Sequence, residues 1–222
     1  MEDLEILKDI TLLYVEDDDE VSIALSRSLM RLCKEVFVAN DGQQGYELFL
    51  KHQDQIDMIV TDIKMPVLDG IGMIKKIREH DSFKPIIITS AHGESEYLYE
   101  AIDEGVASYV LKPINKKRLK ETLVYNAKAM RYERLEKRTM ESIERFLELP
   151  DNAALLFKDK KIIKTSQKLL DLFGYKNIAE LDSHSEEILK ELAEGSVTLD
   201  GSTYKIFGQN VNGTMVLVFF QK

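Results

Sequence analysis

Short apolar segments alternate with amphipathic segments through the first half of the chain, and this alternation limits the possible folds more than any other feature. The apolar segments are continuous runs, which is typical of strands that are buried on both faces of a sheet. The segments between them carry apolar residues at helical spacing. Strands that alternate with helices predict a parallel sheet with helices on both faces and right-handed crossovers. The predicted strands are residues 10–15, 36–39, 56–62, 85–89 and 107–111.

Asp62 stands where the third predicted strand ends, directly after the apolar run. A proline and an Asp-Gly turn follow it, which indicates a loop. In an open α/β sheet the carboxyl ends of the strands form the edge at which ligands bind. The ends of the other strands bring polar residues to the same edge, namely Glu16, Asp17, Ser90 and Lys112. The sequence therefore predicts that groups far apart in the chain converge around Asp62.

The residue types at this edge predict a particular chemistry. Three carboxylates at one point repel one another, which raises their pKa values unless a cation is present. Oxygen ligands with no histidine or cysteine nearby suit Mg²⁺, which binds one or two carboxylates together with phosphate oxygens. A lysine adds a fixed positive charge, and a serine hydroxyl adds a hydrogen bond. An anionic nucleophile with these partners predicts a site that receives a phosphoryl group.

The acidic run that follows the first strand also has a simpler explanation. Acidic residues near the start of a helix are favoured by the helix dipole. This explanation fits Asp19 and Glu20 well. It fits Glu16 and Asp17 less well, because they stand at the end of the strand rather than inside a helical turn.

Residues 1–120 resemble the receiver domain of two-component response regulators. The resemblance rests on Glu16-Asp17, Asp62 with Met65-Pro66 and Asp69-Gly70, Ser90-Ala91, Tyr109, and Lys112-Pro113. It implies a flavodoxin-like, doubly wound sheet of five parallel strands in the order 2-1-3-4-5.

The resemblance also implies roles for the acidic residues. Asp62 would accept a phosphoryl group from a cognate histidine kinase or phosphotransfer protein. Asp17 and Asp62 would bind Mg²⁺ directly, and Glu16 would bind it through a water molecule. The backbone carbonyl of Lys64 would be a further metal ligand.

The remaining residues of the resemblance concern catalysis and switching. Lys112 would contact the phosphoryl oxygens, and its peptide bond to Pro113 would be cis. Ser90 would assist the reaction and would form a switch pair with Tyr109. The new negative charge would draw Ser90 towards it and open space into which Tyr109 turns.

The segment 115–149 contains neither glycine nor proline, and Pro150 ends it. It predicts one long helix, or two nearly continuous helices, of about 50 Å. Beyond its first part, side chains repeat at three- and four-residue spacing, which suits a parallel coiled-coil dimer. The alternative is a helix that packs on its own second domain. The repeating positions are Tyr132, Leu135, Thr139, Ser142, Phe146 and Leu149.

Residues 150–222 predict a small α+β domain with an antiparallel sheet. Two strands precede short helices, the second of them at 188–192, and three strands follow with turns at 200–201 and 212–213. Leu172-Phe173-Gly174-Tyr175 and the residues after it resemble a PAS domain. The domain has no cysteine for a flavin adduct, and His184 lies in a polar loop. A packed core used for protein contacts is favoured over a ligand pocket, and both remain open.

The composition restricts the partners. The net charge is −9, and an acidic chain without a basic patch is a poor nucleic-acid binder. No apolar run approaches the roughly 20 residues of a membrane-spanning helix, so no membrane contact is expected. The acidic N-terminus lacks the pattern of a signal peptide, and the single Cys33 cannot form an internal disulfide. These features favour the cytoplasm.

The predicted organisation is a receiver domain at 1–120, a helical connector at 121–149 and a PAS-like domain at 150–222. We expect a phosphorelay response regulator that is a homodimer and switches contacts with a downstream protein. Its only reactions would be phosphorylation and dephosphorylation of Asp62, so it is not expected to be an enzyme in the ordinary sense. One alternative is an adaptor whose PAS-like domain binds a small molecule and modulates phosphoryl flow. Another is a regulator of a catalytic partner.

Overall fold

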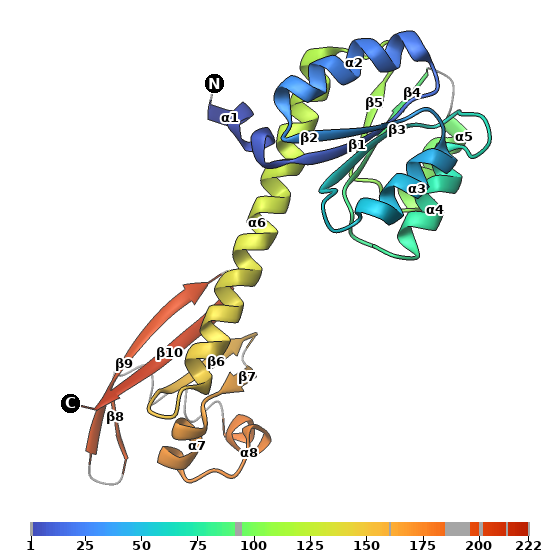
Figure 1. Ribbon diagram of the computed structural model, residues 1–222. Coiled ribbons are helices and arrows are strands. Elements are labelled where there is room, and N and C mark those ends of the chain that lie inside the picture. Colours follow the sequence, from blue (N-terminus) through green and yellow to red (C-terminus); the bar gives the residue numbers. More distant parts are fainter. Residues whose placement is uncertain are drawn as a thin grey trace. The chain divides into compact units, whose positions relative to one another are not determined.

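The computed structural model describes residues 2–91, 95–159, 161–184, 196–199, 202–211 and 213–221. The chain divides into two compact units, Met1–Tyr132 and Glu133–Lys222 (Figure 1). Helix α6, Lys116–Glu148, begins in the first unit and ends in the second, so the predicted long helix is confirmed. The predicted helix at 188–192 and the turn residues 200, 201 and 212 lie outside the described residues.

The N-terminal unit contains a five-stranded sheet in the order β2-β1-β3-β4-β5, and all of its strand pairs are parallel. This confirms the predicted strand order and direction. Every residue of β1, β3 and β4 is buried, which explains why these strands read as continuous apolar runs. The strands are β1 (Thr11–Val15), β2 (Glu35–Ala39), β3 (Met58–Asp62), β4 (Ile86–Ser90) and β5 (Ser108–Leu111).

Helices cover both faces of this sheet (Figure 1). Leu12 and Tyr14 face a core cluster beneath α2 and the first part of α6, whereas Leu13 and Val15 face a cluster beneath α3, α4 and α5. This alternation follows from the two-residue period of a strand. The helices of this unit, besides α6, are α1 (Glu2–Glu5), the 3₁₀-helix η1 (Ile6–Asp9), α2 (Asp19–Leu32), α3 (Gly42–His52), α4 (Gly70–Arg78) and α5 (Ser95–Asp103).

Aspartates begin three of these helices and thereby fix the loops at the carboxyl edge of the sheet. Asp18, Asp41 and Asp69 each accept a hydrogen bond from a backbone N–H in the first turn of α2, α3 and α4 respectively. Such caps satisfy N–H groups that have no partner inside the helix. Each of these loops therefore ends at a capped helix start close to the strand ends.

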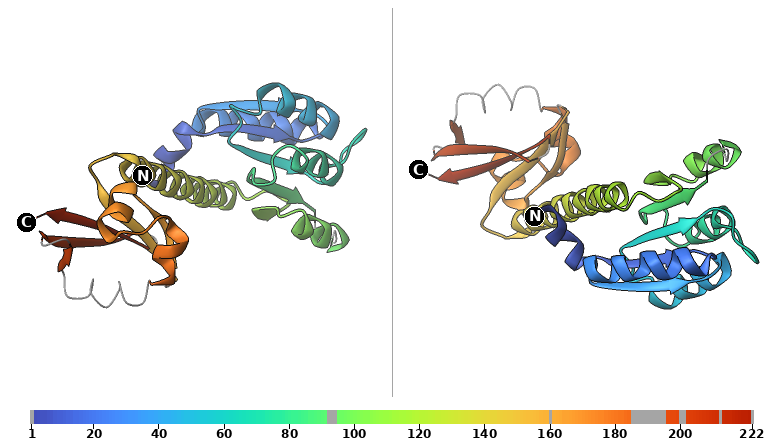
Figure 2. Two further views of the ribbon diagram at one scale, coloured as in Figure 1. Left: turned by 90° about the horizontal axis from the view of Figure 1, so that it is seen from below. Right: turned by 90° about the horizontal axis from the view of Figure 1, so that it is seen from above.

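The C-terminal unit contains a second five-stranded sheet, in the order β7-β6-β10-β9-β8, whose strand pairs are antiparallel. The predicted antiparallel sheet is therefore confirmed. β9 and β10 form a long hairpin, drawn in red in Figures 1 and 2. The elements are β6 (Ala153–Lys158), β7 (Lys161–Thr165), α7 (Gln167–Phe173), α8 (Ile178–Ser183), β8 (Ser196–Leu199), β9 (Ser202–Val211) and β10 (Thr214–Gln221).

The two faces of the second sheet have different partners. One face packs with α7 and α8 in a cluster that includes Leu169 and Leu181. The opposite face packs with the second part of α6, where Leu147 meets Ala154 and Leu156. The alternative prediction, a helix packed on its own second domain, is therefore correct for this part of α6. No helix in the described ranges is long and apolar enough to cross a membrane.

Candidate functional site

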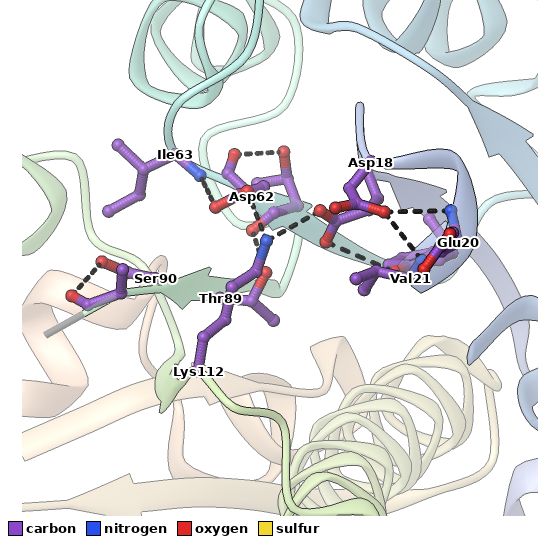
Figure 3. A network of polar contacts seen from close by, with 12 residues as sticks. Asp18, Glu20, Val21, Asp62, Ile63, Thr89, Ser90 and Lys112 are labelled. Atoms are coloured by element: carbon purple, nitrogen blue, oxygen red, sulfur yellow. Dashed lines mark hydrogen bonds and ion pairs between the residues drawn. The ribbon is translucent and has the colours of Figure 1, made fainter. Parts of the chain in front are cut away.

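Figure 3 shows three of the predicted site residues, Asp62, Ser90 and Lys112, at the carboxyl edge of the first sheet. Glu16 and Asp17 follow β1, Asp62 ends β3, Ser90 ends β4, and Lys112 follows β5. The parallel register pairs Asp62 with Thr89 and Ser90 with Leu111, so these strand ends lie next to one another. The convergence predicted from the sequence is therefore present.

Lys112 is the centre of the polar contacts at this edge. Its ammonium Nζ donates to Glu16 Oε1 at 2.7 Å and to Asp62 Oδ2 at 2.5 Å. The other oxygen of Asp62, Oδ1, accepts the backbone N–H of Ile63 at 2.7 Å. Glu16 is only 1% exposed and Asp62 only 8%. The lysine thus holds two buried carboxylates at defined positions. Its peptide bond to Pro113 is cis, as the resemblance implied.

Burial and ion pairing act in opposite directions on these groups. Burial raises the pKa of Asp62 and of Glu16 above their ordinary values, although Lys112 counteracts the shift at both. Burial alone would lower the pKa of Lys112, but its hydrogen bonds to Asp62 and Glu16, and their charges, raise it overall. One ammonium therefore serves two carboxylates, and the site retains negative charge.

The donor set at this edge fits a hard divalent cation. One carboxylate oxygen from each of Glu16, Asp17 and Asp62 lies within 4.8 Å of the other two. Asp17 is exposed, so the cluster is open to solvent on its side. Oxygen ligands, excess negative charge and access to water suit Mg²⁺, which usually retains part of its water shell. Lys64 lies in the loop after Asp62, and its side-chain Nζ lies 5.5 Å from the centre of the Tyr97 ring.

The predicted switch residues lie on neighbouring strands. Ser90 is fully buried at the end of β4, and its hydroxyl donates to the carbonyl of Ala91 at 3.2 Å (Figure 3). Tyr109 lies on β5 opposite Ile88 and is partly buried against a cluster that contains Ala101 of α5. Ser90 thus lies at the same sheet edge as the acidic site, and Tyr109 lies on the adjacent strand in contact with the cluster that includes α5.

The sequence interpretation did not identify two further parts of the site. Tyr14 is fully buried, and its hydroxyl lies 3.5 Å from Glu16 Oε2. The two-residue period of β1 places it on the same face as Glu16, and this signal could have revealed it. Gly70 brings the loop back against β3, since a Cβ at this position would collide with the Asp62 carbonyl oxygen.

The acidic residues after β1 form two groups, and each group matches one of the two explanations given for the acidic run. Asp19 and Glu20 lie in the first turn of α2, where the helix dipole accounts for them. Glu16 and Asp17 precede the helix and belong to the cluster at the sheet edge.

The fold and the arrangement of this site are those of a receiver domain. Residues 12–124 match the family model of the response regulator receiver domain, so the chain belongs to this family of two-component signalling proteins.

Two relatives illustrate the extent of the similarity. The chain is 32% identical over 116 residues to the two-component response regulator-like PRR73 of Oryza sativa subsp. indica, which covers 51% of this chain and 15% of that protein. It is 28% identical over 188 residues to the transcriptional regulatory protein SrrA of Staphylococcus aureus (strain NCTC 8325 / PS 47), which covers 82% of this chain and 76% of that protein. The chain thus spans only a small part of the rice protein.

Solved structures match the N-terminal unit. One is the N-terminal domain of an uncharacterized protein (WS1339) from Wolinella succinogenes, with 37% identity, a TM-score of 0.51, and coverage of 58% of this chain and 98% of that one. Another is a response regulator receiver domain protein from Clostridium thermocellum, with 25% identity, a TM-score of 0.52, and coverage of 57% and 98%.

Proposed function

We propose that this protein is a phosphorelay response regulator that accepts a phosphoryl group on Asp62 and switches protein contacts through its C-terminal unit. The geometry around Asp62 carries the proposal. Asp62 is the last residue of a buried strand, and its carboxylate accepts a hydrogen bond from Lys112 at 2.5 Å. The same carboxylate forms a cluster of oxygens with those of Glu16 and Asp17. A receiver domain of two-component signalling supplies the context for this chemistry.

The phosphoryl donor is a histidine kinase or a phosphotransfer protein with a phosphohistidine. An Asp62 oxygen attacks the phosphorus, an O–P bond forms, and the P–N bond breaks. The imidazole nitrogen keeps the electron pair of that bond and takes a proton from the solvent. Lys112 moves no proton in this step, and its ammonium pairs with the transferred oxygens. The protein acts on no substrate other than its own Asp62, so it is not an enzyme in the ordinary sense.

The acidic cluster would hold Mg²⁺ when the protein is active. Asp17 and Asp62 would bind the ion directly, Glu16 through a water molecule, and Lys64 through its backbone carbonyl. Bound Mg²⁺ would neutralise charge that develops on the transferred phosphoryl oxygens. The residual negative charge of the cluster, with two carboxylates on one lysine, supports this assignment.

Ser90 and Tyr109 transmit the phosphorylation state to the surface. Phosphorylation adds about 1.5 to 2 negative charges next to Ser90. The hydroxyl of Ser90 turns from Ala91 towards the phosphoryl group, and Tyr109 moves into the space that this creates. Because Tyr109 packs against the cluster that includes α5, the surface near that helix changes shape. A coupling free energy of about 1–3 kcal/mol is enough for such a switch.

The C-terminal unit acts as a PAS-like contact module. Two strands, two short helices and three further strands follow one another in this unit, which is the arrangement on which the PAS-like resemblance rests. Large side chains such as Phe173, Phe219 and Leu217 fill the cluster beneath α7 and α8, which favours a packed core over a ligand pocket. We further propose that the protein is a cytoplasmic homodimer joined through α6, and its buried free thiol, Cys33, suits a reducing compartment.

Labelling with a radioactive acyl phosphate tests the proposal. The wild-type protein should incorporate label from acetyl phosphate only when Mg²⁺ is present. Asp62→Asn should lose at least about 99% of the label, because an amide is not a nucleophile here. Asp54→Asn, an exposed aspartate in the same unit, is the matched control and should label normally. Undiminished labelling of Asp62→Asn would remove Asp62 from this role.

A further inference from the structure

An apolar groove of about 710 Å³ lies beside α6 on the outer face of the C-terminal sheet. It is an open groove and not a closed cavity. Among the residues that the structure describes, none that lines the groove carries a charge. Its walls come from α6, β9 and β10, and include Thr139, Ile143, Phe207, Val211, Val216 and Val218.

The groove exists because α6 covers only part of this face. Helix residues such as Leu147 pack over β6 and its neighbour β10, where they meet Leu156 and Val216. Strand β9 lies farther along the sheet and carries Phe207, which is 61% exposed. A large exposed aromatic next to an apolar groove is costly for a protein that remains alone, and such surfaces usually mark interfaces.

We propose that α6 of a second copy of this chain fills the groove, so that the groove is half of a symmetric dimer interface. The inference rests on the homodimer of the proposed function and assigns its surface. In a two-fold interface the same patch must serve both partners, so each copy would offer its α6 and receive the other.

The exposed side of α6 fits this partner. Leu135 is 62% exposed and lies one helical turn before Thr139, which lines the groove. A helix laid along this side of α6 would therefore cover Leu135 and enter the groove in one continuous contact. The heptad spacing that runs through both residues is the spacing at which two helices pack side by side.

The charges beside this stripe select one orientation of the pair. Arg131 precedes Leu135 and Glu136 follows it, and both side chains are exposed. In a parallel pair of helices, charged residues that flank the stripe and are five residues apart meet across the interface. Arg131 of one copy therefore faces Glu136 of the other, and the two-fold symmetry produces this contact twice. An antiparallel pair would instead bring the Arg138 side chains of the two copies together. The helix is therefore complementary to itself in the parallel orientation.

A small molecule fits the groove less well than a helix does. Ligand sites usually bury 70–90% of the ligand surface, and they present a few convergent polar groups. This groove is open, and the polar side chains among its described lining residues are Thr139 and Gln209. A second α6 needs no enclosure, because a helix can lie along an open groove and cover Leu135 at the same time.

Sedimentation velocity of the full-length chain over a dilution series tests the inference. Phe207→Glu should raise the dimer dissociation constant at least about tenfold, since a buried aromatic at an interface centre carries much of the affinity. Ile163→Glu is the matched control, because Ile163 is also an exposed apolar strand residue, 48% exposed, but lies on β7 at the opposite edge of the sheet. It should leave the dissociation constant unchanged.

Exchanging the charges of Arg131 and Glu136 tests the parallel orientation of the two α6 helices, and these exposed positions leave the core unchanged. Arg131→Glu should weaken the dimer because it faces Glu136 of the second copy. The double variant Arg131→Glu with Glu136→Arg should restore it. Failure of the double variant to restore the dimer would overturn the parallel arrangement.

Other results would overturn the groove as the interface. These are a dimer that Phe207→Glu leaves intact, a wild-type chain that stays monomeric at every concentration, or a monomer whose native mass spectrum carries a small molecule that Phe207→Glu loses. Labelling by acetyl phosphate, measured on the same samples, reports the role of Asp62 separately. Normal labelling with an intact Phe207→Glu dimer would reject the groove and leave the phosphoryl-accepting function standing.

Discussion

Lys112 donates to two buried carboxylates, and one ammonium charge cannot balance both. Burial therefore dominates at Asp62 and raises its pKa, which means that the folded protein binds a proton at Asp62 more tightly than the unfolded chain does. The stabilisation from that proton is complete below the unfolded-state pKa of about 3.9. It is lost as the pH rises through the higher folded-state pKa.

Asp62→Asn should consequently stabilise the protein at neutral pH in the absence of Mg²⁺. The amide is neutral at every pH, so it avoids the cost of an ionised buried carboxylate. The gain in free energy of unfolding over wild type should widen as the pH rises from about 4 to 7. Urea unfolding at a series of pH values measures this difference, with Asp54→Asn as the control.

Mg²⁺ should reduce the same difference. The cation offsets the negative charge of the acidic cluster, so it should stabilise wild type more than Asp62→Asn. A gain for Asp62→Asn that does not change with pH, or that shrinks as the pH rises, would contradict this account of the site.

The loop between β3 and α4 determines the backbone conformation directly after Asp62. Three contacts fix the end of this loop. They are the Asp69 cap of α4, the close approach of Gly70 to the Asp62 carbonyl oxygen, and the hydrogen bond from Gly70 N–H to the Ile63 carbonyl at 2.7 Å. Val67, in the middle of the loop, adopts φ 67° and is 84% exposed. A β-branched residue in the left-handed region is strained, and exposure leaves little packing to offset that strain.

Val67→Asn should raise the free energy of unfolding by about 1 kcal/mol, because asparagine tolerates the left-handed region. Thermal or urea unfolding measures it. Val67→Thr keeps the β-branch and should leave the stability almost unchanged. If both variants behaved alike, strain at Val67 would not be the reason.

Helix α6 shows which parts of the structure the sequence could predict. The absence of glycine and proline predicted its length, but the three- and four-residue spacing of its second part suited either a second copy of the helix or the chain's own second domain. Met140, Ile143 and Leu147 face the chain's own sheet, whereas Leu135 remains exposed. Spacing alone cannot show which set of residues packs on the sheet, because both sets repeat at three and four residues. The choice depends on strands that lie much later in the chain.

The strand ends were predictable for a different reason. Parallel strands must bring their carboxyl ends to one edge, so Glu16, Asp62 and Lys112 could be grouped from the sequence alone. The left-handed valine at 67 was not predictable, since residue preference argues against it. Tertiary closure of the loop imposes that conformation.

For the whole molecule, we expect the net charge to oppose binding to DNA. A net charge of −9 opposes the phosphate backbone, and counterion release supplies most nonspecific affinity. A mobility-shift assay at about 10⁻⁵ M protein and physiological salt should therefore show no complex with generic duplex DNA. SrrA, the Staphylococcus aureus relative, is by name a transcriptional regulatory protein and is a useful comparison in the same gel. A tight complex of this chain would refute the protein-contact output.

The central claim is that the signal enters the molecule as an acyl phosphate on Asp62. Borohydride reduction of the acetyl-phosphate-treated protein, followed by peptide mass spectrometry, tests it most directly, because reduction converts a phosphoaspartate into homoserine at its own position. We expect homoserine at position 62 only, and only in samples treated with Mg²⁺. Homoserine at another aspartate, or none despite stable labelling, would contradict it.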